Sequence, residues 1–261
     1  MVAGRLPAAP ANRTMCKIGT AGWAVPRAVA ERFPAQGAGL ERYAARFDAV
    51  EINSTFYRSH RSSTYARWVA ATPSQFRFAV KLPRTITHDA RLVDAIPLVA
   101  AFWIEAQQLG DKLGPLLVQL PPSLAFDFPV ADRFFAGLRQ LWRGAIVCEP
   151  RHTSWFEGEA NALLSAHEVG RVAADPARHP SAASPGGWDG VSYWRLHGSP
   201  KMYYSSYDEA ALCALASRLR DASADEPWCV FDNTTSGAAT ANALILKELI
   251  ALEDDANLSA G

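Results

Sequence analysis

Cysteine is scarce in this chain, and no two cysteines lie close together in the sequence. The four residues are Cys16, Cys148, Cys213 and Cys229, so there is no CxxC pair for a zinc ribbon, a redox site or an iron–sulfur cluster. Cys148 and Cys229 lie in apolar runs, where a free thiol packs as a small hydrophobic group. We therefore expect core thiols and a reducing, cytoplasmic environment.

Long apolar runs and an excess of charge of either sign are also absent. The longest charge-free stretches, residues 113–126 and 233–246, are broken by prolines or begin with polar residues, so neither suits a bilayer span. The 26 basic and 26 acidic residues balance, which gives no bulk attraction to nucleic acid and leaves a local basic patch as an alternative. We expect no membrane role.

The chain does contain enough apolar sequence for a sizeable core, because 49% of its 261 residues are hydrophobic. The first residues have no apolar stretch like that of a secretory signal. We predict a disordered N-terminal tail over residues 1–16, one domain over residues 17–252 and a flexible C-terminal tail over residues 253–261. The sequence carries no signal for an oligomeric state.

Eight strand-like runs alternate with segments of helical length. They cover residues 17–22, 49–53, 76–81, 115–120, 145–149, 171–175, 192–197 and 228–232. This rhythm predicts an α/β fold, a single (β/α)8 TIM-type barrel, because parallel strands need crossover connections. An open doubly wound sheet is the alternative, but the early GTAGW loop lacks the G-x-G-x-x-G phosphate-binding spacing. The interval 176–190 is rich in Pro, Gly, Ser and Ala, so we expect the sixth helix to be short or missing.

Most of these runs end on a side chain that can ionise or form hydrogen bonds. In chain order these residues are Glu51, Asn53, Lys81, Gln119, Glu149, Arg151, Asp175, Arg195, His197, Asp232 and Asn233. Each alone has a structural explanation, such as a helix cap, an ion pair or a core histidine. Together they favour one functional pocket, because the C-terminal ends of barrel strands share a face and unpaired buried charge is costly.

The mixture of charges allows two kinds of chemistry. The first is a Mg²⁺ or Mn²⁺ site with oxygen and imidazole ligands from Glu149, Asp175, His197 and Asp232. The second is a salt-linked site for a sugar or an anion, in which the carboxylates are neutralised by Lys81, Arg151 and Arg195. We favour the second and predict no metal or other cofactor, because each nearby cation opposes metal binding.

Two loops and several aromatic side chains point to a phosphorylated or sugar-like ligand. Residues 198–201 and 233–237 follow the last two predicted strands, where barrels often bind phosphate on backbone N–H groups. Aromatic residues after other strands, among them Tyr57 and Trp155, offer flat faces for stacking on a sugar or a base.

Seven segments together resemble the YecE-like family, also called domain of unknown function 72. They are IGTAGW (18–23), FDAVEINSTFYR (47–58), FRFAVKLPRTITH (76–88), LGPLLVQLPPS (113–123), CEPRHTSWF (148–156), YWRLHG (193–198) and FDNTTSGAATANA (231–243). The resemblance implies a TIM-type barrel with the matched polar residues at its strand ends. It supplies no reaction, and the activities of other barrels carry over only as fold-level analogy. The chain departs from the family after GTAGW, where AVPRAVAERF replaces a polar and aromatic stretch.

Our leading hypothesis is an enzyme of the hydrolase or lyase type that cleaves a phosphorylated sugar or a nucleic-acid fragment. Glu51 and Glu149 are the candidate acid and base, and Asp175 and Asp232 orient them. The predicted ligand-binding residues are Asn53, Tyr57, Lys81, Gln119, Arg151, Trp155, Arg195, His197, Asn233 and Thr234. A desolvated Lys81 would instead suit a Schiff-base nucleophile, which we do not favour. The alternative function is a non-enzymatic module that binds nucleic acid or a nucleotide in the same pocket.

Overall fold

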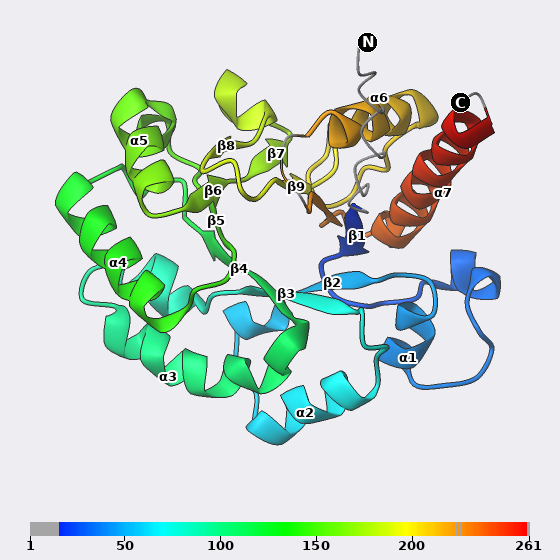
Figure 1. Ribbon diagram of the computed structural model, residues 1–261, viewed down its shortest axis with the longest axis horizontal. Coiled ribbons are helices and arrows are strands. Elements are labelled where there is room, and N and C mark those ends of the chain that lie inside the picture. The colour runs from blue at the N-terminus through cyan, green and yellow to red at the C-terminus, as the bar shows by residue number, and fades with distance from the viewer. Residues whose placement is uncertain (1–15, 223, 225, 260–261) are drawn as a thin grey trace, which may run out of the picture.

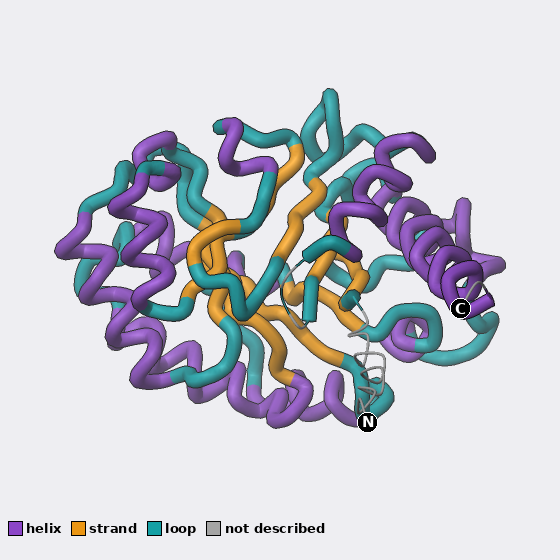
Figure 2. Tube along the Cα trace, turned by 45° about the horizontal axis from the view of Figure 1, so that its top comes forward, coloured by secondary structure: helices purple, strands orange, loops and turns teal. Residues whose placement is uncertain are grey.

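The computed structural model describes residues 16–222, 224 and 226–259, and it shows an α/β fold with the strands at the centre (Figure 2). All eight predicted strand segments are present, the sixth as two short strands. The strands are β1 (Lys17–Thr20), β2 (Ala49–Ile52), β3 (Arg77–Lys81), β4 (Leu113–Gln119), β5 (Ile146–Glu149), β6 (Val169–Arg171), β7 (Ala173–Asp175), β8 (Gly186–Gly187), β9 (Tyr193–Leu196) and β10 (Trp228–Phe231).

Helices lie around the outside of the strands, with α1 to α5 along one side and α6 and α7 on the other (Figure 1). They are α1 (Gly39–Ala44), α2 (Ser62–Ala70), α3 (Ile96–Ala106), α4 (Phe128–Leu141), α5 (Gly158–Ala166), α6 (Glu209–Arg220) and α7 (Ala238–Ser259). Between β7 and β9 the chain forms only a 3-10 turn, η6 (Pro180–Ala183), and β8, so no α-helix covers this interval. This agrees with the expectation of a short or missing sixth helix.

The strands form two sheets rather than one closed sheet. One sheet has the order β1-β10-β9-β7, and the other has the order β2-β3-β4-β5-β6-β8. All neighbours pair in parallel except β6 and β8. The α/β class is confirmed, but the single closed barrel that we predicted is not.

The sheets meet at β1 and β2, where a tyrosine hydroxyl stands between the two backbones. Tyr43 Oη accepts from the Thr20 N–H (2.9 Å) and donates to the Ala49 carbonyl (3.2 Å). One β-bridge, between Ala21 and Glu51, joins the strands directly. A β-carbon on Gly19 would collide with the Ala49 carbonyl, so the close approach requires glycine. The Tyr43 hydroxyl thus replaces direct hydrogen bonds between the backbones of β1 and β2, and the sheet is interrupted at this point.

The second junction lies between β6 and β7, which only Val172 separates. Gly170 and Arg171 of β6 pair with the antiparallel β8, whereas β7 pairs with β9. The two halves of one extended segment therefore belong to different sheets. The sequence pattern shows this segment as a single run, because the alternation of side chains continues across Val172.

The described residues cover only part of the two predicted tails. Residues 1–15 and 260–261 lie outside the described residues, and α7 continues to Ser259, so residues 253–259 of the predicted C-terminal tail are helical. In the described part of the chain, no helix has the length and apolar character needed to cross a membrane.

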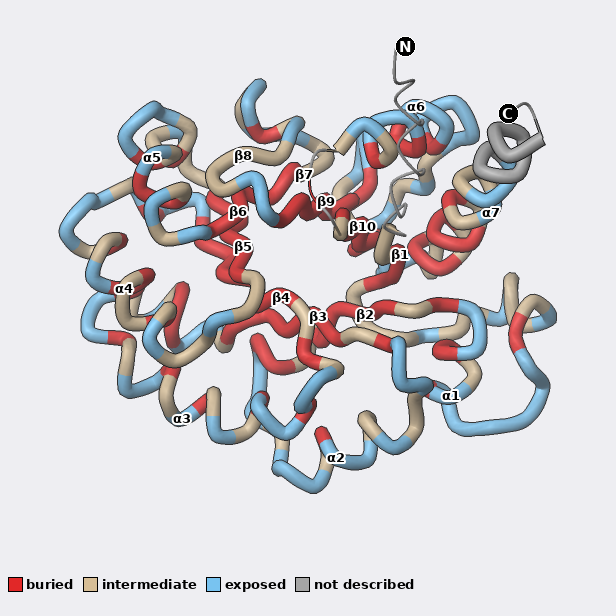
Figure 3. The backbone as a smooth tube through the Cα atoms, viewed as in Figure 1, coloured by how far each residue is buried: buried red, intermediate tan, exposed pale blue. Residues whose placement is uncertain are grey.

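The core consists of two apolar clusters on opposite faces of the strands. The larger lies between the strands and the helices, and Figure 3 shows buried residues concentrated on the strands and on the inner sides of the helices. The smaller joins both sheets and contains Ala49, Ala79, Leu117, Val147, Val172, Val191, Tyr193, Trp228 and Val230. Because side chains alternate between the two faces of a strand, a residue two positions after a member of either cluster points to the same face as that member.

The first prediction concerns the junction of β1 and β2. Tyr43→Phe removes the hydroxyl and leaves the Thr20 N–H and the Ala49 carbonyl without this partner, so we expect a loss of about 1–3 kcal/mol in the free energy of unfolding, measured with urea. Tyr65→Phe is the control, because the buried Tyr65 hydroxyl has no hydrogen-bond partner in the part of the chain that the structure describes. Equal losses in the two variants would contradict the bridging role.

Candidate functional site

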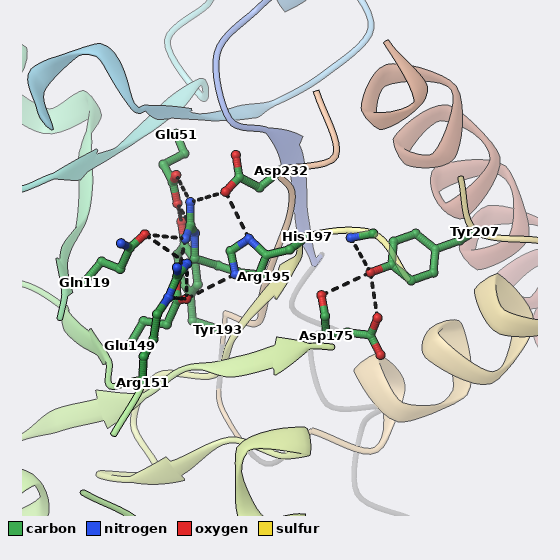
Figure 4. A network of polar contacts seen from close by, with 11 residues as sticks. Glu51, Gln119, Glu149, Arg151, Asp175, Tyr193, Arg195, His197, Tyr207 and Asp232 are labelled. Carbon is green, nitrogen blue, oxygen red and sulfur yellow. Dashed lines mark hydrogen bonds and ion pairs between the residues drawn. The ribbon is translucent and has the colours of Figure 1, made fainter. Parts of the chain in front are cut away.

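Six polar side chains enter the space between the sheets one layer above the smaller apolar cluster. Each follows a member of that cluster by two residues and therefore points to the same face. They are Glu51 after Ala49, Lys81 after Ala79, Gln119 after Leu117, Glu149 after Val147, Arg195 after Tyr193 and Asp232 after Val230. The ends of β2, β3, β4, β5, β9 and β10 thus contribute to one buried polar cluster. Figure 4 labels all of these residues except Lys81.

Arg195 lies at the centre of this cluster with 0% of its surface exposed. Its Nε and Nη2 donate to the two oxygens of Glu51 at 3.0 and 2.8 Å. Nη2 also donates to Asp232 Oδ2 at 3.0 Å, and Nη1 donates to Glu149 Oε2 at 2.5 Å and Gln119 Oε1 at 3.1 Å. A guanidinium has five N–H donors, and all five have acceptors here.

The pKa of Arg195 follows from this arrangement. Burial alone would lower the pKa, but the carboxylates of Glu51, Glu149 and Asp232 raise it well above its usual value. Arg195 is therefore permanently charged and fully bonded. It cannot give an anionic ligand a free N–H group without breaking one of these five bonds, which argues against the direct binding role that we expected.

Glu149 is held by three cations. Arg151 Nε donates to Oε1 at 3.0 Å, Arg151 Nη2 forms an ion pair with the same oxygen at 2.9 Å, and His197 Nε2 lies 3.1 Å from it. Burial raises the pKa of Glu149, but Arg195, His197 and Arg151 together hold it well below its ordinary value. A fixed carboxylate of this kind is a poor general acid.

His197 bridges Glu149 and Asp232. Its Nδ1 lies 3.0 Å from Asp232 Oδ2, and both ring nitrogens thus face carboxylates. Burial lowers the pKa of His197, but these two carboxylates outweigh burial and raise it above 6.5. The pKa of Asp232 is raised by burial but lowered overall by Arg195 and His197. The two carboxylates thus favour the imidazolium form of His197.

Three polar groups of the cluster keep bonding capacity. Among the described residues, Asp232 Oδ1, Gln119 Nε2 and Lys81 Nζ have no hydrogen-bond partner, and none of these atoms is fully enclosed. Lys81 is 5% exposed, and its Nζ lies 4.0 Å from the centre of the Phe56 ring. Burial and the nearby Arg195 lower the pKa of Lys81 to about 8. These groups face the accessible part of the site.

Two predicted site residues lie outside the cluster. The Asp175 carboxylate accepts from the Tyr207 hydroxyl at 2.8 Å, to one side of the cluster in Figure 4. Asn233 uses both amide hydrogens on Ser205 O and Asn242 Oδ1, at 2.9 Å each. Asp175 follows Ala173 and Asn233 follows Phe231, both in the larger apolar cluster, so both point toward the helices. We correct their predicted positions accordingly.

The remaining predicted residues differ in their access to a ligand. Trp155 is 1% exposed and donates to the Leu124 carbonyl, so it packs beneath loops and offers no free face. Tyr57 is 74% exposed and packs edge-on against Phe56, and Thr234 is exposed. Asn53 has a buried Oδ1 without a hydrogen-bond partner in the described residues.

Of the four alternative magnesium or manganese ligands, Glu149, His197 and Asp232 lie together, but Asp175 does not. Asp175 is separate, and Glu149 and Asp232 are bonded to Arg195 and His197. Among the described residues, no group of three or more His, Cys, Asp or Glu side chains has the arrangement of a metal site.

The sequence analysis did not place Tyr193 at the site or Phe56 over the Lys81 amine. The Tyr193 hydroxyl donates to Glu51 Oε2 at 3.0 Å and fixes that carboxylate from below. Phe56 covers one side of the Lys81 amine. The position of Tyr193, two residues before Arg195 on one strand, was a signal for their common face.

The geometry defines an α/β protein with a buried, salt-linked polar cluster at the C-terminal ends of its parallel strands. Residues 17–260 match the family described as "Protein of unknown function DUF72", and the chain belongs to this family.

Known proteins support this assignment. UPF0759 protein YecE of Escherichia coli K12 is 32% identical over 152 residues, which are 56% of this chain and 55% of that protein; the match thus spans about half the length of this curated relative. A DUF72 family protein from Thermotoga maritima has a similar fold, with a TM-score of 0.76, 24% identity and coverage of 91% of this chain and 99% of that chain. The 3-keto-D-glucoside 4-epimerase YcjR from E. coli is more distant, with a TM-score of 0.50, 12% identity and coverage of 90% and 99%.

The second prediction tests the central arginine. Arg195→Met leaves three buried carboxylates without their shared cation, so we expect a loss of about 3–5 kcal/mol in the free energy of unfolding near neutral pH. The loss relative to the wild type should shrink toward about pH 5, because protonation of the buried carboxylates removes the negative charge that Arg195 no longer compensates. Arg171→Met is the control, since Arg171 is buried but binds Asn161 and the Ser181 carbonyl. If the stability of the two variants depends on pH in the same way, Arg195 does not act as the shared cation of the three carboxylates.

The third prediction concerns His197. Because its folded pKa is raised above 6.5, its charge stabilises the fold fully below that pH, and this contribution is lost as pH rises through the folded pKa. The stability difference between wild type and His197→Gln should therefore decline with rising pH in urea unfolding experiments. NMR titration of the His197 ring should give a pKa above 6.5, and a lower value would exclude the imidazolium.

Proposed function

We propose that the protein is an enzyme that cleaves a phosphorylated sugar or a nucleic-acid fragment by acid–base chemistry at the buried polar cluster. The observation that carries this proposal is the division of the cluster into fully bonded groups and free ones. Arg195 uses all its donors and both oxygens of Glu149 are bonded, whereas Asp232 Oδ1, Gln119 Nε2 and Lys81 Nζ have no partner among the described residues.

The charge of the cluster favours an anionic ligand. The carboxylates of Glu51, Glu149 and Asp232 are matched by the cations that contact them, which are Arg195, Arg151 and His197. Protonated Lys81 is then an unbalanced positive charge in a poorly solvated position. Electrostatic attraction is strong at such a site because little water screens it.

The bonding pattern changes the roles that we expected of the acidic residues. We assign the general base to Asp232, whose Oδ1 is free while Oδ2 is fixed by Arg195 and His197. Glu51 and Glu149 then hold Arg195 and Arg151 in place, and Arg151, which keeps a partly exposed guanidinium, contacts the anion. The similarity in fold to the distant 3-keto-D-glucoside 4-epimerase is consistent with a sugar substrate, but it is an analogy between folds only.

The second candidate function is a nucleic-acid or nucleotide binding module without turnover. The exposed Tyr57 next to the cluster favours it, because a free aromatic face suits base stacking. Such a module needs no free base in the cluster, and Asp232 Oδ1 therefore favours the enzyme.

We further propose that the two sheets are parts of one TIM-type barrel. Ala21 and Glu51 join β1 to β2, and the chain passes directly from β6 to β7, so each interruption is local. A site at the C-terminal strand ends is where barrel enzymes bind substrate. All four cysteines are free thiols, which agrees with the cytoplasmic location that we propose.

The fourth prediction tests the anion site by isothermal titration with inorganic phosphate and ribose 5-phosphate. Arg151→Gln should weaken binding by about 10–100-fold, because a charge-assisted contact is lost. Asp175→Asn is the matched control and should bind like the wild type, since its carboxylate is turned away from the cluster. Equal affinities of wild type and Arg151→Gln would exclude the anion site.

The same probes, together with a single-stranded oligonucleotide, separate the two functions. In ³¹P NMR time courses, the wild type should consume a phosphorylated probe, while Asp232→Asn should bind it without turnover. Binding that is steeply salt-dependent and never followed by turnover would favour the module and overturn the enzyme.

A further inference from the structure

We propose that Lys81 is a nucleophile that forms an imine with an aldehyde or ketone group of the substrate. The inference rests on the proposed function and deepens it, because it names the reactive group of the ligand. A phosphorylated sugar in its open-chain form contains such a carbonyl.

The surroundings of Lys81 set it apart from the other lysines of the chain. Lys17 and Lys247 pair with carboxylates, and Lys112 donates to the carbonyls of Val69 and Thr72. Lys81 is 5% exposed, its Nζ has no hydrogen-bond acceptor among the described residues, and it lies over the Phe56 ring. Lys201 also lies over an aromatic ring, that of Tyr204, but it is exposed. An amine without an acceptor keeps its lone pair accessible once it loses a proton.

The position of Lys81 is also rigid. Its carbonyl accepts from Thr55 Oγ1 at 2.6 Å, and the next residue, Leu82, donates to the Leu117 carbonyl at 2.9 Å. These bonds fix the end of β3 against η2 (Ser54–Phe56) and β4. The loss of charge on Lys81 is favoured by burial and by Arg195, and the lowered pKa of about 8 means that a useful fraction of the amine is neutral near pH 7.

The reaction needs no oxidant, reductant or metal. The Nζ lone pair attacks the carbonyl carbon, and the carbonyl oxygen takes a proton from solvent to give a carbinolamine. Asp232 Oδ1 accepts the proton that the nitrogen loses and returns it to the carbinolamine oxygen, which leaves as water while the C=N bond forms. The protonated imine then draws electrons from the adjacent bond, which suits a lyase.

The fifth prediction is reductive trapping with cyanoborohydride and glycolaldehyde, followed by peptide mapping of the intact wild-type protein. We expect one hydroxyethyl group on Lys81, added about tenfold or more faster than on Lys201, the matched exposed lysine that also lies over an aromatic ring. The rate on Lys81 should rise with pH around its pKa of about 8. Lys81→Arg, which keeps the charge, should lose this adduct.

Glycolaldehyde phosphate separates this inference from the proposed function. Faster trapping with the phosphate, lost in Arg151→Gln, supports both. Trapping of Lys81 without any gain from the phosphate keeps the imine and contradicts the anion site. If Lys81 is labelled no faster than Lys201, the imine proposal is wrong, even if phosphate binding depends on Arg151.

Discussion

The structure depends on one buried guanidinium. Arg195 binds carboxylates from β2, β5 and β10 and the amide oxygen of a β4 residue, so a single side chain on β9 links strands of both sheets. Breaking one of these contacts would leave a charge in a nearly water-free space, where such charges are expensive. The backbones of β1 and β2 are linked directly by one β-bridge. The polar cluster therefore helps to hold the two sheets together, which continuous backbone pairing would do in a closed sheet.

The same constraint shapes the chemistry. Because Arg195 uses all its donors, it holds Glu51, Glu149 and Asp232 in fixed positions and settles which of their oxygens are free. Preorganised charges of this kind act without rearrangement during a reaction. In the function that we propose, the reactive groups are the second oxygen of Asp232, which Arg195 leaves unbound, and the amine of Lys81, which lies near Arg195.

Much of this could be predicted from the sequence. The strand segments followed from apolar runs, and the polar cluster followed from the residues at their ends. Side-chain alternation would also have shown that Asp175 and Asn233 face the helices, since each follows a residue of the larger apolar cluster by two. The role of Tyr43 and the depth of Trp155 could not be predicted, because they depend on contacts between distant segments. No local pattern shows that all five donors of Arg195 are used.

The most direct test of the account is a crystal structure of the protein with glycolaldehyde phosphate bound. We predict that the phosphate contacts Arg151, that the carbonyl carbon lies next to Lys81 Nζ and Asp232 Oδ1, and that Arg195 keeps all its carboxylate contacts. A ligand that binds away from the cluster, or one that draws Arg195 away from Glu51 and Asp232, would contradict the account.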